Sequence, residues 1–297
     1  MKKSYLVLIF MLIILLAMST SLMAADQVVT NNNDTGAGSL RQAIVGVTTG
    51  CTITFNLSSG NETITTASQF SISGKDFTID GDNTAGSGTN IILQANANPW
   101  TATHRLFYIS SSGTDLTVKN MTLQNANTTS DGGAFYIRDA VTLTIENCTV
   151  RNNRGKQGGF LFISNGSASC TADNCTIFGN KAHNTFNNSC GGGVYFLSGG
   201  TFTATNSTFS ENKSDYNGSG GFLNFRATSG SSHSITLTNC TISGNEAGTC
   251  GTCKGGAIFI YVGSDNGAAV SVSLTNCTID GNTGNTAKGI RCETSWT

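Results

Sequence analysis

The sequence has few charged residues, few histidines and only one long apolar run, and each shortage excludes a class of function. Charged residues make up 11% of the 297 residues and the formal net charge is −1, so the basic footprint of a nucleic-acid-binding protein is absent. The three histidines, His104, His183 and His233, are scattered along the chain. We therefore expect no metal and no cofactor. Beyond residue 25 no segment is apolar enough to span a membrane.

The single apolar run stands at the N-terminus and predicts export. Met1-Lys2-Lys3 precedes the run, which covers residues 5–17, and small residues follow it up to Ala25. This is the pattern of a secretory signal peptide over residues 1–25, with cleavage near Ala24 or Ala25. The alternative is a membrane anchor, but the run is shorter than the ~20 residues that a span needs. We expect a bacterial protein that is secreted or held at the cell surface.

A repeat centred on asparagine fills the second half of the chain. The repeated residues are Asn120, Asn147, Asn174, Asn206, Asn239 and Asn276, spaced 27 to 37 residues apart. Periods of this size indicate a solenoid, a propeller or a tandem array. Propeller blades need four strands in about 40 to 50 residues, so repeats of 27 are too short for them. The repeat therefore favours a solenoid.

Each repeat carries the pattern of three short strands. Apolar and polar residues alternate before the asparagine and again after it, as in 235–238 and 240–242, which predicts two strands meeting at a corner. A third strand follows a glycine pair in each repeat, at Gly132-Gly133, Gly158-Gly159, Gly192-Gly193, Gly220-Gly221 and Gly255-Gly256. Three strands per turn predict an all-β, single-stranded parallel β-helix over residues 51–297. Its coils would stack ~4.8 Å apart.

Stacking turns repeated positions into columns. The asparagines would form a ladder of side-chain amides, and the next position an inward column of Met121, Cys148, Cys175, Ser207, Cys240 and Cys277. Parallel side chains are poorly placed for the dihedral angle of a disulfide, so we expect free thiols there. A threonine column, Thr122, Thr149, Thr176, Thr208, Thr241 and Thr278, would face outward. The loop motif Cys250-Gly251-Thr252-Cys253 favours a local disulfide between Cys250 and Cys253.

The stretch before the repeats predicts an N-terminal cap over residues 26–50. A turn-rich segment leads into Ser39, a good helix N-cap, and Leu40, Ala43 and Ile44 share one face of a short helix. Such a helix can cover the open end of a solenoid. Irregular first coils are predicted from strands at Cys51–Phe55, Glu62–Thr65, Phe77–Asn83, Asn90–Leu93 and Leu106–Ile109. Residues 288–292 resemble the start of a further coil, so we expect the helix to be incomplete at the C-terminus or covered there by a partner.

Two motifs carry a resemblance to known families. The run Ser39-Leu40-Arg41-Gln42-Ala43-Ile44 resembles the N-terminal cap of secreted bacterial right-handed β-helix proteins with a pectate-lyase-like fold. The glycine pairs and the turns 209–212, 242–245 and 279–282, each Phe or Ile followed three residues later by Asn, are similar to the short motifs of polymorphic outer-membrane proteins. The resemblance implies a right-handed parallel β-helix with a short capping helix, exported to the cell surface.

Three functions remain open. The first is an exported, non-catalytic, adhesin-like surface scaffold that binds carbohydrate or a host or matrix surface through loops such as 181–191 and 263–269, where solenoids accept insertions. The second is a carbohydrate-active hydrolase or lyase. Its candidate site is the column of Lys119, Glu146 and Asp173, with Arg151 nearby. Neighbouring carboxylates ~5 Å apart match the geometry of retaining glycosidases, although a solvated face with compensating charges gives the same pattern. The third is an ice-binding threonine array built from 203–205, 236–238 and 273–275, which Lys119, Glu146 and Asp173 interrupt.

Overall fold

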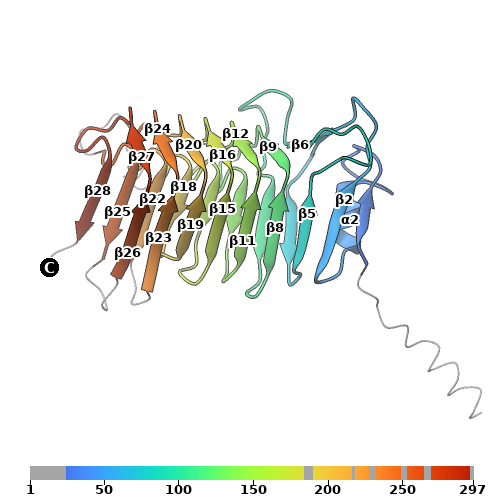
Figure 1. Cartoon of the computed structure of the whole chain (residues 1–297), viewed down its shortest axis with the longest axis horizontal. Helices are drawn as coiled ribbons and strands as arrows, with labels where there is room; N and C mark the ends of the chain where they lie inside the picture. Colours follow the sequence, from blue (N-terminus) through green and yellow to red (C-terminus); the bar gives the residue numbers. More distant parts are fainter. Residues whose placement is uncertain are drawn as a thin grey trace, which may run out of the picture.

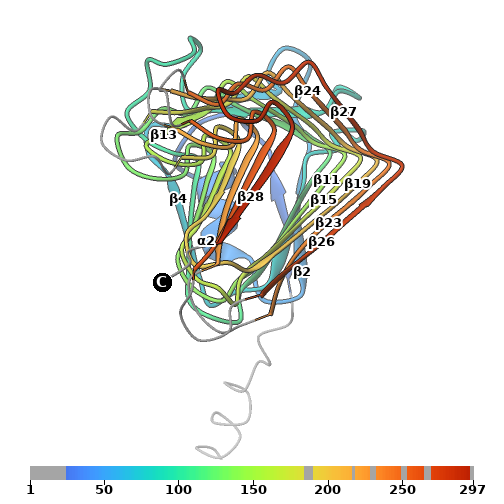
Figure 2. The same ribbon diagram turned by 90° about the vertical axis from the view of Figure 1, so that its left-hand side faces the viewer.

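The protein folds into a straight solenoid in which strands of successive turns lie side by side (Figure 1). The computed structural model describes residues 25–183, 190–215, 218–227, 232–248, 253–263 and 269–294. Residues 1–24 lie outside these ranges, so the predicted signal peptide stays a prediction. Seen end-on, the coils superpose into a three-sided outline (Figure 2). Strand pairing is parallel from coil to coil, which confirms the predicted parallel β-helix.

Three long sheets form the sides of the solenoid. Sheet A contains β1 (Gln27–Val29), β2 (Cys51–Phe55), β5 (Phe77–Asp80), β8 (Asp115–Lys119), β11 (Thr142–Glu146), β15 (Ser169–Asp173), β19 (Thr201–Thr205), β23 (Ser232–Thr238) and β26 (Ala269–Thr275). Sheet B contains β3 (Thr63–Thr65), β6 (Ile91–Gln94), β9 (Met121–Gln124), β12 (Thr149–Arg151), β16 (Thr176–Phe178), β20 (Thr208–Ser210), β24 (Thr241–Ser243) and β27 (Thr278–Asp280). Sheet C contains β4 (Phe70–Ser73), β7 (Phe107–Ser110), β10 (Phe135–Ile137), β14 (Leu161–Ile163), β18 (Val194–Phe196), β22 (Leu223–Ala227), β25 (Ile258–Val262) and β28 (Ile290–Thr294).

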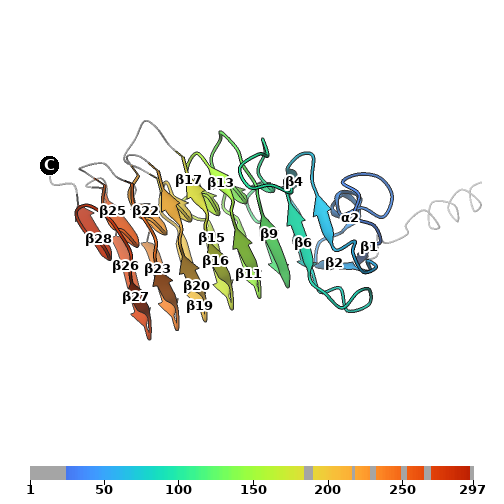
Figure 3. The ribbon, with the colours of Figure 1, turned by 90° about the horizontal axis from the view of Figure 1, so that it is seen from above.

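A fourth, short sheet lies at the corner between sheets B and C. Sheet D contains β13 (Arg154–Gly155), β17 (Lys181–Ala182) and β21 (Lys213–Ser214). Figure 3 shows β13 and β17 side by side at one edge of the solenoid. In the end-on view β13 lies across the outline from the corner where sheets A and B meet (Figure 2). Sheet D was not predicted from the sequence.

Alternating side chains explain why these segments form strands. In β11 the side chains of Leu143 and Ile145 are fully buried, whereas Thr142 and Glu146 face outward. Phenylalanine rings continue the core along the axis, as in the stack of Phe107 on Phe135 with ring centroids 4.9 Å apart. The core therefore fills the interior between the three sheets, and each coil buries its apolar side chains against the coils on either side.

The corner between sheets A and B carries the predicted asparagine ladder. All six repeated asparagines have φ between 50° and 55°, the left-handed region that asparagine tolerates better than other residues with a side chain. Asn147 donates to Asn120 at 3.1 Å and Asn174 donates to Asn147 at 2.7 Å. The chain of amides is then interrupted, because Asn206 donates to Asp173 at 3.3 Å rather than to Asn174. It resumes above Asn206, through Asn239 and Asn276.

The cysteine column beside this corner is buried and unpaired in disulfides, as predicted. Cys148, Cys175 and Cys240 are at most 2% exposed and are free thiols, and Cys277 in the last coil is a partly exposed free thiol. The Cys148 Sγ atom donates to the Glu146 carbonyl at 3.2 Å. Burial raises the pKa of the Cys148 thiol to about 12 and that of Cys175 to about 11. These thiols are therefore protonated packing groups.

A second asparagine ladder runs inside the solenoid, just before sheet D. Its members are Asn153, Asn180, Asn212, Asn245 and Asn282, and each is at most 5% exposed. The backbone N–H and side-chain amide of Asn153 both donate to Asn180 Oδ1, at 3.1 and 3.0 Å. The same pair of bonds joins Asn180 to Asn212 and so on up the stack. The sequence placed Asn212, Asn245 and Asn282 in turn motifs, and a second ladder was not predicted.

The capping helix is as predicted. Helix α2 (Leu40–Gly46) begins after Ser39, whose hydroxyl accepts from the Gln42 backbone N–H at 3.2 Å, and its buried residues are Leu40, Ala43 and Ile44. Figure 3 shows α2 at the end of the solenoid next to β1. Strand β1 pairs with β2, so the segment that also carries the cap supplies the first strand of sheet A. Neither β1 nor β4 was expected from the sequence.

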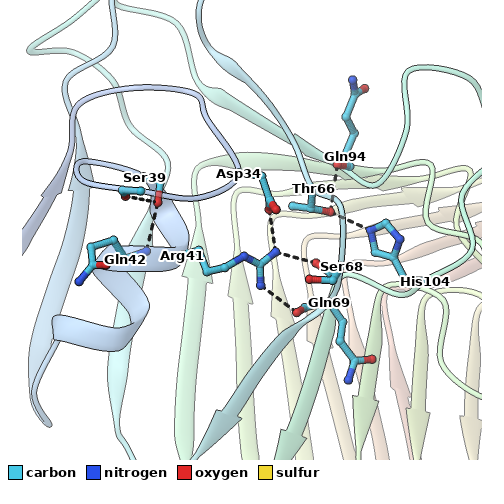
Figure 4. Close-up of polar contacts among 10 residues, drawn as sticks. Asp34, Ser39, Arg41, Gln42, Thr66, Ser68, Gln69, Gln94 and His104 are labelled. Carbon is cyan, nitrogen blue, oxygen red and sulfur yellow. Dashed lines mark hydrogen bonds and ion pairs between the residues drawn. The ribbon is translucent and has the colours of Figure 1, made fainter.

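Arg41 fastens this helix to the first coil (Figure 4). Its Nη2 atom is 2.7 Å from Asp34 Oδ1 and donates to the Ser68 carbonyl at 2.8 Å, while Nη1 donates to the Gln69 carbonyl at 3.0 Å. The guanidinium also lies 4.5 Å over the Phe70 ring. One side chain thus joins the turn before α2 to the segment that leads into β4, which fixes the helix over the open end.

The glycine pairs mark places where neighbouring coils touch. At Gly133, Gly159, Gly192, Gly221 and Gly256, an added Cβ would lie 2.1 to 2.6 Å from a carbonyl oxygen of the next coil. No side chain fits at such distances. The predicted pair Gly192-Gly193 is wrong by one residue, because Gly159 donates to the Gly192 carbonyl and Gly158 to that of Gly191. The true pair is Gly191-Gly192, and Gly193 stands in the position that Phe160 and Phe222 occupy in neighbouring coils.

Candidate ligand-binding groove

The carboxylate column predicted from the sequence is in register. Lys119, Glu146 and Asp173 are direct partners on the successive strands β8, β11 and β15. Lys119, however, pairs with Asp80 of the preceding coil, with Nζ 3.1 Å from Oδ2. The predicted neighbours therefore do lie next to each other, but the lysine is engaged elsewhere.

The bonds of the individual residues do not resemble those of a catalytic pair. Asp173 Oδ1 accepts from the Thr205 hydroxyl and from the Asn206 amide, so this carboxylate bridges the gap in the corner ladder. Glu146 forms no hydrogen bond or ion pair through its side chain with the described residues. Arg151 lies on β12 in sheet B, where its Nε donates to Gln124 at 2.8 Å. The structure thus joins Glu146 and Asp173 by register and leaves Arg151 on a different sheet.

The threonine array is also in register. Thr203 and Thr205 on β19 pair with Thr236 and Thr238 on β23, and these pair with Ser273 and Thr275 on β26. The array is therefore a regular patch on the outer face of sheet A.

A concave surface lies over sheet D. It is a groove of about 440 Å³, and it is lined by Trp100, Arg154, Lys181, His183, Lys213, Asp215 and Gly248. Arg154 pairs with Lys181 and Lys181 with Lys213. Single bridges extend this column to Asn127 on one side and to Glu246 and Thr283 on the other. Three cations in consecutive coils therefore form the floor of the groove.

The local sequence explains why these side chains face outward. Each of them directly follows a buried ladder asparagine, and each is followed by a buried small residue, as in Asn180-Lys181-Ala182. Alternation then brings His183 and Asp215 back to the surface one residue later. The groove was not predicted from the sequence. The signal that could have found it is the cation that follows an apolar-x-x-Asn turn in three consecutive coils, as in Ile177-Phe178-Gly179-Asn180-Lys181.

Most ionisable groups of the groove have a partner. Lys213 Nζ is 2.8 Å from Glu246 Oε1, and His183 Nδ1 is 3.4 Å from Asp215 Oδ2. Lys181 Nζ lies 4.9 Å over the ring of Trp100. The guanidinium of Arg154 forms no hydrogen bond or ion pair with the described residues.

Trp100 is held in place by the loop that carries it. Its φ is 66°, an unusual conformation for a bulky residue. The Asn127 side-chain amide donates to the carbonyls of Trp100 and Ala102, both at 2.9 Å, and Asn125 donates to the carbonyls of Asn96 and Ala97. Backbone strain of this kind persists only where surrounding bonds fix it, and it is frequent at binding sites. The loop therefore holds the indole ring in position along one side of the groove.

Parts of the predicted binding loops fall outside the described residues. Of loop 181–191, Lys181 and His183 line the groove, whereas residues 184–189 and, in loop 263–269, residues 264–268 are not described. Cys253 is disulfide-bonded, but Cys250 lies outside the described residues, so the predicted Cys250–Cys253 pairing stays a prediction.

The described residues show neither a metal-ligand cluster nor a membrane-spanning helix. No group of three or more His, Cys, Asp or Glu side chains that could hold a metal ion was found within the described ranges. In the same part of the chain, no helix has the length and apolarity that crossing a membrane requires.

The stack of parallel sheets, the capping helix and the two ladders define a β-helix solenoid. The chain belongs to the family described as the right handed beta helix region, whose family model matches residues 108–295. This confirms a right-handed parallel β-helix, and the match covers all six asparagine repeats. Comparison with curated proteins gave no match. Comparison with solved structures gave none either.

Proposed function

We propose that the protein is an exported, non-catalytic β-helix that serves at the cell surface as an adhesin-like binding scaffold. The observation that carries this proposal is the groove over β13, β17 and β21, where a fixed indole ring stands beside three cations in register. Ligand sites typically combine an aromatic surface with a few placed polar groups. The signal-peptide pattern of residues 1–25 supports export, and sequencing the N-terminus of the mature protein tests it.

The bonding pattern favours binding over chemistry. General acid–base catalysis needs a group that is free to exchange a proton with the substrate. In the groove Lys213 is paired with Glu246. In the carboxylate column Lys119 is paired with Asp80 and Asp173 accepts two hydrogen bonds, so Glu146 has no free carboxylate beside it. We infer that the ligand is a carbohydrate, on a host or matrix surface, that the groove holds without cleaving.

A glycan-array screen of the mature protein tests this proposal. Trp100→Ala should weaken binding about tenfold, because the groove loses its aromatic wall. Tyr261→Ala is a matched control. Tyr261 lies on β25, outside the groove, and like Trp100 its ring contacts a cation, since the Arg226 guanidinium is 5.4 Å from the ring centroid. The control should bind as the unmodified protein does. Equal losses in both variants, or no binding to any glycan, would contradict a binding role for the groove.

A carbohydrate-active enzyme remains the second candidate because Glu146 and Asp173 are register partners. Reducing-end release should be assayed on every glycan that binds. Turnover that disappears in both Glu146→Gln and Asp173→Asn would replace the scaffold proposal with a hydrolase or lyase. Binding without turnover would support the scaffold.

A further inference from the structure

Two cations of the groove lie opposite each other, and neither charge is neutralised by a carboxylate of the described residues. Arg154 and Lys181 are direct partners on β13 and β17, and like charges directly opposite on neighbouring strands destabilise a sheet. Neither side chain forms an ion pair with the described residues. The next cation of the column, Lys213, is neutralised by Glu246 at 2.8 Å. The excess positive charge is therefore confined to one pair.

The acidic groups around this pair are already engaged. Asp215, the one carboxylate among the described residues that line the groove, lies 3.4 Å from His183, and Glu246 is bonded to Lys213. Lys181 is placed instead over the Trp100 ring, which attracts a cation but does not cancel its charge. An anion from outside the chain would neutralise both side chains.

We propose that the groove binds an acidic oligosaccharide, whose carboxylate or sulfate groups pair with Arg154 and Lys181 while a sugar ring packs beside Trp100. This inference rests on the proposed function, because it names the ligand class of the same groove. The indole offers an apolar face for the C–H face of a sugar ring. The guanidinium offers a planar fork of donors that matches carboxylate and sulfate oxygens.

The geometry sets the direction and the length of the ligand. Strands of successive coils lie ~4.8 Å apart, so the column from Arg154 to Lys213 spans about 10 Å along the solenoid axis. The groove of about 440 Å³ follows that column. A linear saccharide of two or three units, lying along the axis and carrying at least two acidic groups, fits this site.

The charge pattern of the whole chain argues against nucleic acid in this groove. A nucleic-acid site needs a basic stripe along the phosphate backbone, whereas the chain has net charge −1 and its basic column ends at Glu246. A short acidic saccharide needs only the two or three contacts that the groove provides.

Isothermal titration of the mature protein with four matched trisaccharides tests the inference. The probes are β-1,4-linked mannuronate trimer, its methyl ester, mannotriose and sulfated mannotriose, each at low and high salt. The mannuronate trimer or the sulfated trimer should bind, the ester and the neutral sugar should bind at least about tenfold more weakly, and high salt should reduce the difference because it screens exposed charges. Comparing the two acidic probes distinguishes carboxylate from sulfate as the preferred group.

Substitutions then locate the contact. Arg154→Gln and Lys181→Gln should each weaken binding of the acidic probe about fivefold, the usual upper range for one exposed ion pair. Lys288→Gln, an exposed lysine in the last coil, is the control and should leave binding unchanged. The urea midpoint of Arg154→Gln should be unchanged or raised, since the substitution removes a like-charge repulsion. That readout separates lost binding from lost folding.

The outcomes distinguish failure of this inference from failure of the proposed function. If the ester or the neutral trimer binds as tightly as the acidic probes, the acidic-ligand inference is wrong while a binding groove survives. Tighter binding of a single-stranded oligonucleotide or an acidic peptide than of the acidic trimers would also overturn it. If no saccharide binds in titration or on the array, both proposals are wrong.

Discussion

The two asparagine ladders use the same side chain for different purposes. At the corner of sheets A and B, each asparagine adopts a left-handed backbone, and single amide bonds join the asparagines of successive coils except between Asn174 and Asn206. In the interior ladder, none of the asparagines has a positive φ. Asn180, for example, accepts from the backbone and side chain of Asn153 and donates to Asn212 and to the Val150 carbonyl.

The corner asparagines are selected for their backbone conformation, whereas the interior asparagines are selected for the buried hydrogen bonds that they form. The corner ladder is partly exposed, and its break between Asn174 and Asn206 is bridged by the Asp173 carboxylate, which accepts from Asn206. The interior ladder is nearly sealed from water, so a missing amide would leave buried N–H and C=O groups without partners. The first ladder is therefore needed for its φ angle, and the second for its hydrogen bonds.

The largest expected effect comes from breaking the interior ladder. Asn212→Ala removes the acceptor of the Asn180 N–H and side-chain amide and the donor to the Ile177 carbonyl. We expect the free energy of unfolding to fall by about 3 kcal/mol, since each unsatisfied buried group costs roughly 1–3 kcal/mol. Urea denaturation followed by circular dichroism measures it. Ser210→Ala, on the half-buried position two residues earlier, is the control, and a loss below about 1 kcal/mol in Asn212→Ala would contradict the sealed interior.

Breaking the corner ladder should cost less. Asn239→Ala forces alanine into φ 54°, which costs about 1–2 kcal/mol for a residue with a Cβ. Asn239→Gly loses the same amide bonds but accepts this conformation, so it should regain most of the loss in the same urea experiment. An equal loss in both variants would show that the corner ladder also depends on its amides.

The gap at Asp173 offers a smaller test. Asp173→Asn keeps an acceptor oxygen for Thr205 and Asn206 and should leave the urea midpoint unchanged. Asp173→Ala removes that acceptor from a half-buried site and should cost about 1 kcal/mol. The register partner Glu146 has no such bonds, so Glu146→Gln should be neutral. A stability loss in Glu146→Gln equal to that of Asp173→Ala would contradict the bridging role of Asp173.

The smallest effect concerns pH at the N-terminal end of the corner ladder. Burial acts to raise the pKa of Asp80, but hydrogen bonds from Asn120 and the Asp82 backbone, together with Lys119, outweigh it and lower that pKa. The stabilisation is therefore present above the ordinary carboxyl pKa and is lost as pH falls through the lowered value in the folded protein. Asp80→Asn should reduce the difference between the free energies of unfolding at neutral pH and at pH about 3, measured by urea denaturation, by less than about 1 kcal/mol. An unchanged pH profile in Asp80→Asn would rule out this contribution.

The corner ladder, the thiol column and the capping helix could be predicted because they depend on local patterns. Asn239 and Cys240 recur at fixed positions after an alternating strand, and Ser39 precedes a helical apolar face. The groove could not, because its members have different identities and come from strands of two residues, too short to show alternation. Trp100 reaches the groove from a loop three coils away from Lys181. The shifted glycine pair has a similar cause, since Gly191, Gly192 and Gly193 are indistinguishable until the register is known.

The glycine columns have a consequence for how such a chain could lengthen. Along the glycine columns, a carbonyl of one coil lies where the neighbouring coil has no side chain. In the interior ladder, Asn180, Asn212 and Asn245 each accept from the asparagine of one neighbouring coil and donate to that of the other. A duplicated coil inserted between two others would therefore form the same glycine contacts and ladder hydrogen bonds with the coil on each side. Duplication of one repeat within the gene would give a longer folded rod in a single step, whereas a partial coil would put every column out of register.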